Sequence, residues 1–167
     1  MSDKKIALLK IQPEHNVEIA KIIRDTLTEF NAAKPGTVFF DPTTDDLFKL
    51  FQTPRSYYYI AFLNDKIVGG CGVFPSPGLL DNTCELVKLY LLPEARGMGL
   101  GKKLIKISCE KALELGYSKI YLETMPELKF ALPLYESLGF EYLPESLTTG
   151  EHFGCDLFMM KDLANSF

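Results

Sequence analysis

The stretch CELVKLYLLPEARGMGLGKKLIKISCEKALELG, residues 84–116, contains a strand, a glycine-rich loop and a helix in direct succession. Apolar and β-branched side chains dominate residues 84–92, which predicts a strand. Beyond the loop, apolar residues recur at helical spacing with charged residues between them, which predicts an amphipathic helix. The inward positions of this helix are Leu100, Leu104, Ile107 and Ala112. Gly116 is typical of a residue just past a helix end.

Three alternate glycines precede or begin this helix, at Gly97, Gly99 and Gly101. Without Cβ atoms the backbone can approach a ligand closely, and the N–H groups of a first helical turn have no partner within the helix. These groups and the positive end of the helix dipole favour a phosphate ligand. Arg96, Lys102 and Lys103 can add positive charge.

Two known phosphate loops fit this segment poorly. A P-loop needs G-x-x-x-x-G-K followed by Ser or Thr, but Arg96 stands at its first glycine and Lys103 at its hydroxyl residue. A dinucleotide fingerprint, G-x-G-x-x-G, fits Gly97 and Gly99 but has Lys102 at the third glycine. A carboxylate does follow about 20 residues on, so this second interpretation stays open.

Length and composition indicate one globular domain over residues 1–167, because 47% hydrophobic and 24% charged residues exclude a disordered or fibrous chain. Acidic residues outnumber basic ones by 22 to 18, so we expect no nucleic-acid partner. No apolar run approaches the roughly 20 residues that span a bilayer, and no secretory signal is visible. We therefore expect no membrane association and a cytoplasmic location. The four cysteines are scattered, which favours reduced thiols and no bound metal.

The rest of the chain alternates between short strands and helices. Further strands are predicted at residues 5–11, 57–63, 67–74, 117–123, 140–143 and 153–161. Helices are predicted after Pro13, over about 44–51 and over 127–138. The second and third strands form a hairpin through the turn at residues 64–66. This order predicts an α/β or α+β fold with a mixed sheet and helices on both faces.

Residues 96–101, RGMGLG, resemble the R/Q-x-x-G-x-G/A pyrophosphate loop of the GCN5-related N-acetyltransferase (GNAT) superfamily, and LYLLP at 89–93 resembles its lead-in. A second segment, ALPLYESLGF at 131–140, is similar to the family's A-x-x-L-Y-x-x-x-G-F segment. Two positions depart from the pattern. Leu128 replaces a frequent Asn, and Pro133 removes a helical N–H group, so that the helix either starts late or kinks there.

The resemblance implies the acyl-CoA N-acyltransferase fold, a mixed, largely antiparallel sheet of about seven strands that splays between 84–92 and 117–123. Acetyl-CoA would enter this gap as a cosubstrate, with no metal. Its pyrophosphate would bind the glycine loop, and its pantetheine arm would pair with the preceding strand as an added strand does. The implied cofactor-binding residues are Leu89, Tyr90, Leu91, Arg96, Gly97, Met98, Gly99, Leu100, Gly101, Lys102 and Lys103.

Acyl transfer to an amine requires a neutral amine, a stabilised oxyanion and a proton for the departing thiolate. The resemblance places the hydroxyl of Tyr135 beside the CoA sulfur as the general acid. Backbone N–H groups near Leu91 could stabilise the oxyanion. Carboxylates in apolar strands are candidate bases, because loss of water raises their pKa. Glu85 is the first such candidate and Glu123 the second, although each could instead hold the substrate ammonium or form a surface salt bridge.

Other residues are weaker candidates. Glu85 shares strand parity with the leucines at 89 and 91 unless a bulge near Tyr90 breaks it. A covalent route through Cys84 is disfavoured, because no histidine is near in sequence to activate the thiol. His152 and Asp41 could border the acceptor pocket.

These observations predict an enzyme that transfers an acetyl group from acetyl-CoA to a primary amine by direct attack in a ternary complex. An amino acid, a polyamine and a protein N-terminus are all compatible acceptors, because one fold supports many chemistries. A CoA-binding sensor without turnover is the alternative, and a dinucleotide-binding oxidoreductase is less favoured. A homodimer is the commonest default assembly.

Overall fold

A computed structural model of the chain describes residues 3–149 and 154–164. Seven strands form one sheet in the order β1-β2-β3-β4-β5-β7-β6. β4 and β5 run parallel, whereas the other neighbouring pairs are antiparallel. The strands are β1 Ile6–Lys10, β2 Tyr57–Leu63, β3 Lys66–Phe74, β4 Thr83–Leu91, β5 Lys119–Thr124, β6 Glu141–Leu143 and β7 Leu157–Asp162.

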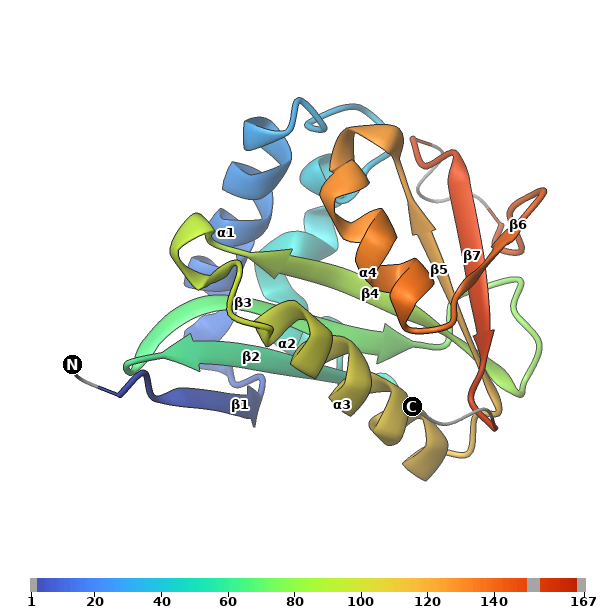
Figure 1. Cartoon of the computed structure of the whole chain (residues 1–167), viewed down its shortest axis with the longest axis horizontal. Coiled ribbons are helices and arrows are strands. Elements are labelled where there is room, and N and C mark those ends of the chain that lie inside the picture. The colour runs from blue at the N-terminus through green and yellow to red at the C-terminus, as the bar shows by residue number, and fades with distance from the viewer. Residues whose placement is uncertain (1–2, 150–153, 165–167) are drawn as a thin grey trace.

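Helices cover both faces of this sheet (Figure 1). The core on one face is formed with α1 and α2, and the core on the other with α3 and α4. The α-helices are α1 Asn16–Glu29, α2 Leu47–Leu50, α3 Leu100–Glu114 and α4 Leu132–Ser137. The 3-10 helices are η1 Pro13–His15, η2 Val38–Phe40, η3 Pro42–Asp46, η4 Pro93–Ala95 and η5 Pro126–Ala131. The predicted fold class, a mixed and largely antiparallel sheet between two helical layers, is confirmed.

β4 and β5 separate soon after they begin. They pair over residues 83–85 and 119–121 and then diverge. Figure 1 shows β4 crossing the sheet while β5 rises steeply away from it, with α4 drawn across the gap. The predicted splay between these strands is therefore present, and it leaves one backbone edge of β4 beyond Glu85 without β5 as a partner.

A bulge interrupts β4 at Lys88. Gly72 pairs with Val87 and Gly70 with Tyr90, so two residues of β4 stand opposite one residue of β3. This is the interruption near Tyr90 that the sequence analysis allowed for, so Glu85 no longer shares strand parity with Leu89 and Leu91. Leu89 packs in the core on the α3 face, whereas Val87 and Tyr90 pack in the core on the α1 face.

Most predicted elements are present with shifted ends. The helix expected at 127–138 consists of η5, which non-helical backbone angles at Leu128 interrupt, followed by α4, which has Pro133 in its first turn. Of the two options for Pro133, the late start is confirmed. Ile107, which the sequence predicts to face inward, is half-buried, whereas Ile105 is fully buried. The start expected for the last strand, at 153, lies outside the described residues. Within the part of the chain that the structure describes, no helix is long and apolar enough to cross a membrane.

Candidate active site

The glycine loop forms an uncapped start to α3. Gly97 and Gly99 have φ values of +77° and +79°, a left-handed conformation that favours glycine. A Cβ added at either position would meet no atom within 4 Å, so the loop is open above both. Gly99 is the N-cap of α3, and the helix has no side-chain cap. The N–H of Lys103 bonds to the Gly99 carbonyl at 3.1 Å, so the preceding first-turn N–H groups lack a helical partner.

Those first-turn donors belong to Leu100, Gly101 and Lys102, all of which the sequence assigned to cofactor binding. The side chains of Lys102 and Lys103 are exposed beside them. A Cβ at Gly101 would lie 3.3 Å from the Leu134 side chain, so a glycine here lets α4 approach the start of α3 closely. N–H donors at the positive end of a helix, with two lysines nearby, suit a diphosphate group.

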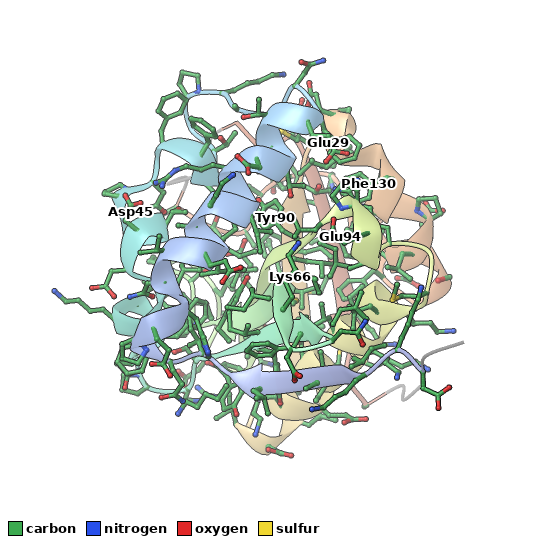
Figure 2. All side chains as sticks on the ribbon, turned by 90° about the vertical axis from the view of Figure 1, so that its left-hand side faces the viewer. Glu29, Asp45, Lys66, Tyr90, Glu94 and Phe130 are labelled. Atoms are coloured by element: carbon green, nitrogen blue, oxygen red, sulfur yellow. The ribbon has the colours of Figure 1, made fainter. Side chains whose placement is uncertain are left out.

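The guanidinium of Arg96 binds protein groups and is not placed as a phosphate ligand. It donates to both carboxylate oxygens of Glu29 in α1, at 2.7 and 3.0 Å, and twice to the carbonyl of Leu91, at 3.1 and 2.9 Å. It also lies over the rings of Phe30 and Phe130, which stack on each other. Figure 2 shows Glu29 and Phe130 near each other at the top of the molecule. Arg96 therefore joins the end of β4 to α1 and η5. The sequence analysis instead assigns its positive charge to phosphate binding.

The edge of β4 offers backbone groups to the gap. The Leu92 N–H donates to the Val68 carbonyl at 2.8 Å, so Leu92 faces β3. Because backbone direction alternates along a strand, Tyr90 also faces β3, whereas the N–H groups of Leu89 and Leu91 face the gap. Two of the three β4 residues assigned to cofactor binding thus present their backbone there, and Tyr90 presents only its buried side chain.

Tyr135 lies on α4, packed edge-on against Phe140 with ring centroids 5.8 Å apart. Its side chain is 7% exposed and sits in the core on the α3 face. Burial raises the pKa of Tyr135 well above its usual value, with smaller contributions from nearby Cys71 and Tyr90. The hydroxyl therefore stays protonated at neutral pH, which suits a proton donor.

Glu85 and Glu123 both lie where β4 and β5 separate. Both line two neighbouring cavities, one beside α2 and the loop at Ser76, the other beside Tyr90 and η5. Glu85 is 9% exposed and accepts a hydrogen bond of 2.5 Å from the Ser76 hydroxyl. The structure thus brings together the two carboxylates that the sequence singled out separately.

Three hydroxyl groups hold the carboxylate of Glu123. Its Oε2 accepts hydrogen bonds of 2.6 Å each from Tyr121, Ser146 and Thr148. The last two lie in the segment that follows β6, so this segment is tied to the end of β5. Glu123 is half-buried.

The cavities contain residues that sequence reasoning missed or weighed differently. Lys88, at the bulge, lines both cavities, and nothing in its sequence neighbours indicated this. Asp41 lines the first cavity, as anticipated, whereas His152 lies outside the described residues. Cys84 is fully buried and burial raises its pKa, so it is protonated and unsuited to covalent catalysis. Burial likewise raises the pKa of Cys155, in the second cavity, to about 12.

Comparison with known proteins agrees with this geometry. Residues 19–140 match the model of the acetyltransferase (GNAT) family. The chain belongs to this family. An uncharacterised N-acetyltransferase of Escherichia coli, YjgM, is 38% identical over 151 residues, which cover 90% of each chain. The GNAT chain is thus an N-acetyltransferase, and the dinucleotide-binding oxidoreductase alternative is set aside.

Solved GNAT structures share the fold at low sequence identity. An acetyltransferase of the GNAT family from Staphylococcus aureus superposes with a TM-score of 0.84 at 20% identity, covering 95% of this chain and 99% of its own. The PaiA N-acetyltransferase of Thermoplasma acidophilum, solved with coenzyme A, gives a TM-score of 0.69 at 16% identity over 95% and 99%. The recognised family and its fold are therefore confirmed.

Proposed function

We propose that this GNAT chain transfers an acetyl group from acetyl-CoA to a primary amine of a small molecule, by direct attack while both substrates are bound. The observation that carries the proposal is the pair of cavities lined by Glu85 and Glu123 where β4 and β5 separate. An amine that enters from this side meets carboxylates beside the strand edge that faces the gap.

The residues on the cosubstrate side fit coenzyme A. The uncapped first turn of α3 supplies N–H donors for the pyrophosphate, and the Leu89 and Leu91 edge can receive an extended pantetheine arm as a further strand would be received. When bound, acetyl-CoA supplies the activated acyl group as a thioester. The complex of the Thermoplasma relative with coenzyme A supports this assignment.

Each of the three requirements of acyl transfer can then be assigned to a group of this chain. Glu85 accepts the proton of the incoming ammonium, directly or through a water molecule, because it is the more buried of the two carboxylates. Glu123, held by three hydroxyl groups, orients the amine. The Leu91 N–H is available to an oxyanion, and the Tyr135 hydroxyl supplies a proton to the leaving thiolate.

The first test measures thiol release from acetyl-CoA in the presence of a panel of primary amines. Amine-dependent release is the expected result. Thermal stabilisation by CoA without release from any amine would instead indicate a sensor, and the proposal would be wrong.

Replacing Tyr135 with phenylalanine tests the acid. The substitution keeps the ring and its packing on Phe140, so we expect kcat to fall by about 100-fold with little change in acetyl-CoA affinity. Tyr142→Phe is the matched control. Tyr142 is 49% exposed and donates to Glu136 on the outside of α4, so its loss should leave kcat unchanged. Unaltered turnover in Tyr135→Phe would remove this residue from the chemistry.

A further inference from the structure

Apolar side chains form a large part of the lining of the first cavity. They are Leu50 and Phe51 at the end of α2, Phe74 at the end of β3 and Val87 in β4, and we call this group the apolar wall. Polar side chains complete the lining, from η3 and from the segments around residues 76 and 148. The first cavity can therefore receive more than an ammonium group alone.

The apolar wall is continuous. The rings of Phe51 and Phe74 meet edge to face with centroids 5.7 Å apart. Val87 pairs with Gly72 of β3, where a Cβ would lie 3.1 Å from the Phe51 ring, so the missing side chain leaves room for that ring. All four members of the wall pack against or within the core on the α1 face.

Three of these side chains keep surface in contact with water. Leu50, Phe74 and Val87 are half-buried, whereas Phe51 behind them is only 3% exposed. Apolar atoms that line a cavity gain free energy when another apolar group covers them. A charged group in the same place would lose hydration without a polar partner among these side chains. The wall therefore favours an apolar part of the acceptor.

Strand register places the apolar wall next to the amine. Phe74 stands directly opposite Glu85 in the β3–β4 pair, so both side chains lie on one face of the sheet, and Val87 follows on the same face. Glu85 and Val87 line both cavities, and Tyr90, between the two residues of β4 that face the gap, lines the second. The thioester therefore approaches from the second cavity, and the rest of the acceptor extends into the first.

The size of the first cavity limits this part of the acceptor. Its volume is about 110 Å³. An apolar cavity of about 150 Å³ holds a benzene molecule, so a group of at most about six carbons fits here.

We propose that the acceptor is a primary amine whose nitrogen carries a compact apolar substituent of about four to six carbons, in contact with Leu50, Phe74 and Val87. This inference rests on the proposed function and narrows it. A polyamine would place a second ammonium group against these side chains, and it is therefore the disfavoured class of acceptor.

The first experiment measures thiol release from acetyl-CoA with n-alkylamines from propylamine to octylamine. We expect kcat/KM to rise by about 4-fold for each methylene added up to pentylamine, and to stop rising beyond hexylamine. Pentylamine and 1,5-diaminopentane form a matched pair that differs only in the terminal ammonium group. The monoamine should be preferred by at least about 10-fold in kcat/KM.

Two variants test the apolar wall itself. Phe74→Ala enlarges the cavity and should move the best substrate to a longer alkylamine, and Leu50→Gln should reduce the preference for pentylamine over the diamine to below about 3-fold. Phe48→Ala is the control. Phe48 is also half-buried at the edge of the α1-face core and, within the described part of the chain, lies outside the linings of both cavities. It should keep the wild-type order of acceptors, and thermal unfolding shows whether each variant is folded.

The outcomes separate this inference from the proposed function. Equal kcat/KM along the alkylamine series, or a preference for the diamine, would overturn the apolar substituent while acetylation of amines stands. The same holds if other amines are acetylated and none of this series is. A folded Leu50→Gln and a folded Phe74→Ala that both keep the wild-type order would show that the wall serves only packing. Thiol release with no amine at all would overturn the proposed function, and this inference with it.

Discussion

Replacing Arg96 with alanine tests whether this residue positions the glycine loop or binds the phosphates itself. The guanidinium forms a two-pronged pair with Glu29, whose side chain is 38% exposed, so this pair contributes at most about 1 kcal/mol. Its hydrogen bonds to the Leu91 carbonyl contribute about 1.5 kcal/mol, since the donor is charged. Contacts with two half-exposed rings add about 0.5 kcal/mol each. We expect Arg96→Ala to lower the free energy of unfolding by about 2 to 4 kcal/mol.

The companion variant Glu29→Gln distinguishes the two roles. If Arg96 acts by joining α1 to the end of β4, removal of its partner charge should weaken CoA binding in the same direction as Arg96→Ala, but less. If Arg96 binds phosphate directly, Glu29→Gln releases the guanidinium and should leave CoA affinity equal or higher. Chemical denaturation measures stability and calorimetry measures CoA affinity. Unchanged stability in Arg96→Ala, together with higher affinity in Glu29→Gln, would refute the positioning role.

Arg24 provides the matched control. It donates to both carboxylate oxygens of Asp45 and to the Phe39 carbonyl, the same chemistry elsewhere on α1. Figure 2 shows Asp45 far across the molecule from Glu29. Arg24→Ala should therefore lose some stability while CoA affinity stays at the wild-type level.

The pH dependence of stability adds a further check on the same pair. The hydrogen bond from Arg96 holds the pKa of Glu29 below its usual value. Because the folded-state pKa is the lower one, the contribution of this pair is present above the ordinary glutamate pKa and is lost as the pH falls through the depressed value. The stability difference between wild type and Arg96→Ala should narrow on acidification below about pH 4.5. A constant difference would show that Glu29 contributes nothing.

Two further predictions concern the loop and the covalent route. Gly99→Val forces a β-branched residue to a φ of +79° beside the phosphate donors, so CoA affinity should fall by at least about 10-fold in calorimetry. Gly116→Ala, at φ +91° beyond the other end of α3, is the control and should lower stability without changing CoA affinity. Cys84→Ala should lose about 1 kcal/mol of stability but keep its turnover, and mass spectrometry should detect no acetylated enzyme after incubation of wild type with acetyl-CoA. Acetyl transfer to Cys84 would contradict the direct mechanism.

The elements of the fold could largely be predicted because their signals are local. The hairpin turn at Asn64 and Asp65, both left-handed in the structure, follows from residues that tolerate that conformation. Gly116 ends α3 for the same kind of reason. The sequence analysis allowed for a bulge near Tyr90 but could not establish it, because the contacts that accompany the bulge come from other strands. They are the hydroxyl of Tyr58 and the close approach of β3, where a Cβ at Gly69 would lie 2.1 Å from the Tyr90 carbonyl.

The residues of the candidate site also differ in whether a local sequence signal identifies them. The loop glycines, Tyr135 and the two carboxylates stand out in sequence because their residue types are informative in themselves. Arg96 was given a plausible role and a different partner, since Glu29 is 67 residues away in the chain. Because Arg96 is next to the glycine loop in the chain, the sequence suggests a phosphate as its partner. The fold instead brings the Glu29 carboxylate to Arg96.

One irregularity of β4 connects the two substrates. By adding a residue, the bulge turns Leu89 toward the α3 face and keeps Val87 and Tyr90 on the α1 face. The same shift decides which N–H groups face the gap, and it places Lys88 at the cavities lined by Glu85 and Glu123 instead of within a regular pleat. A regular strand would change both arrangements together, since side-chain direction and backbone direction alternate with the same period. The strand edge that faces the gap and the position of the lysine that lines both cavities therefore depend on a single backbone feature.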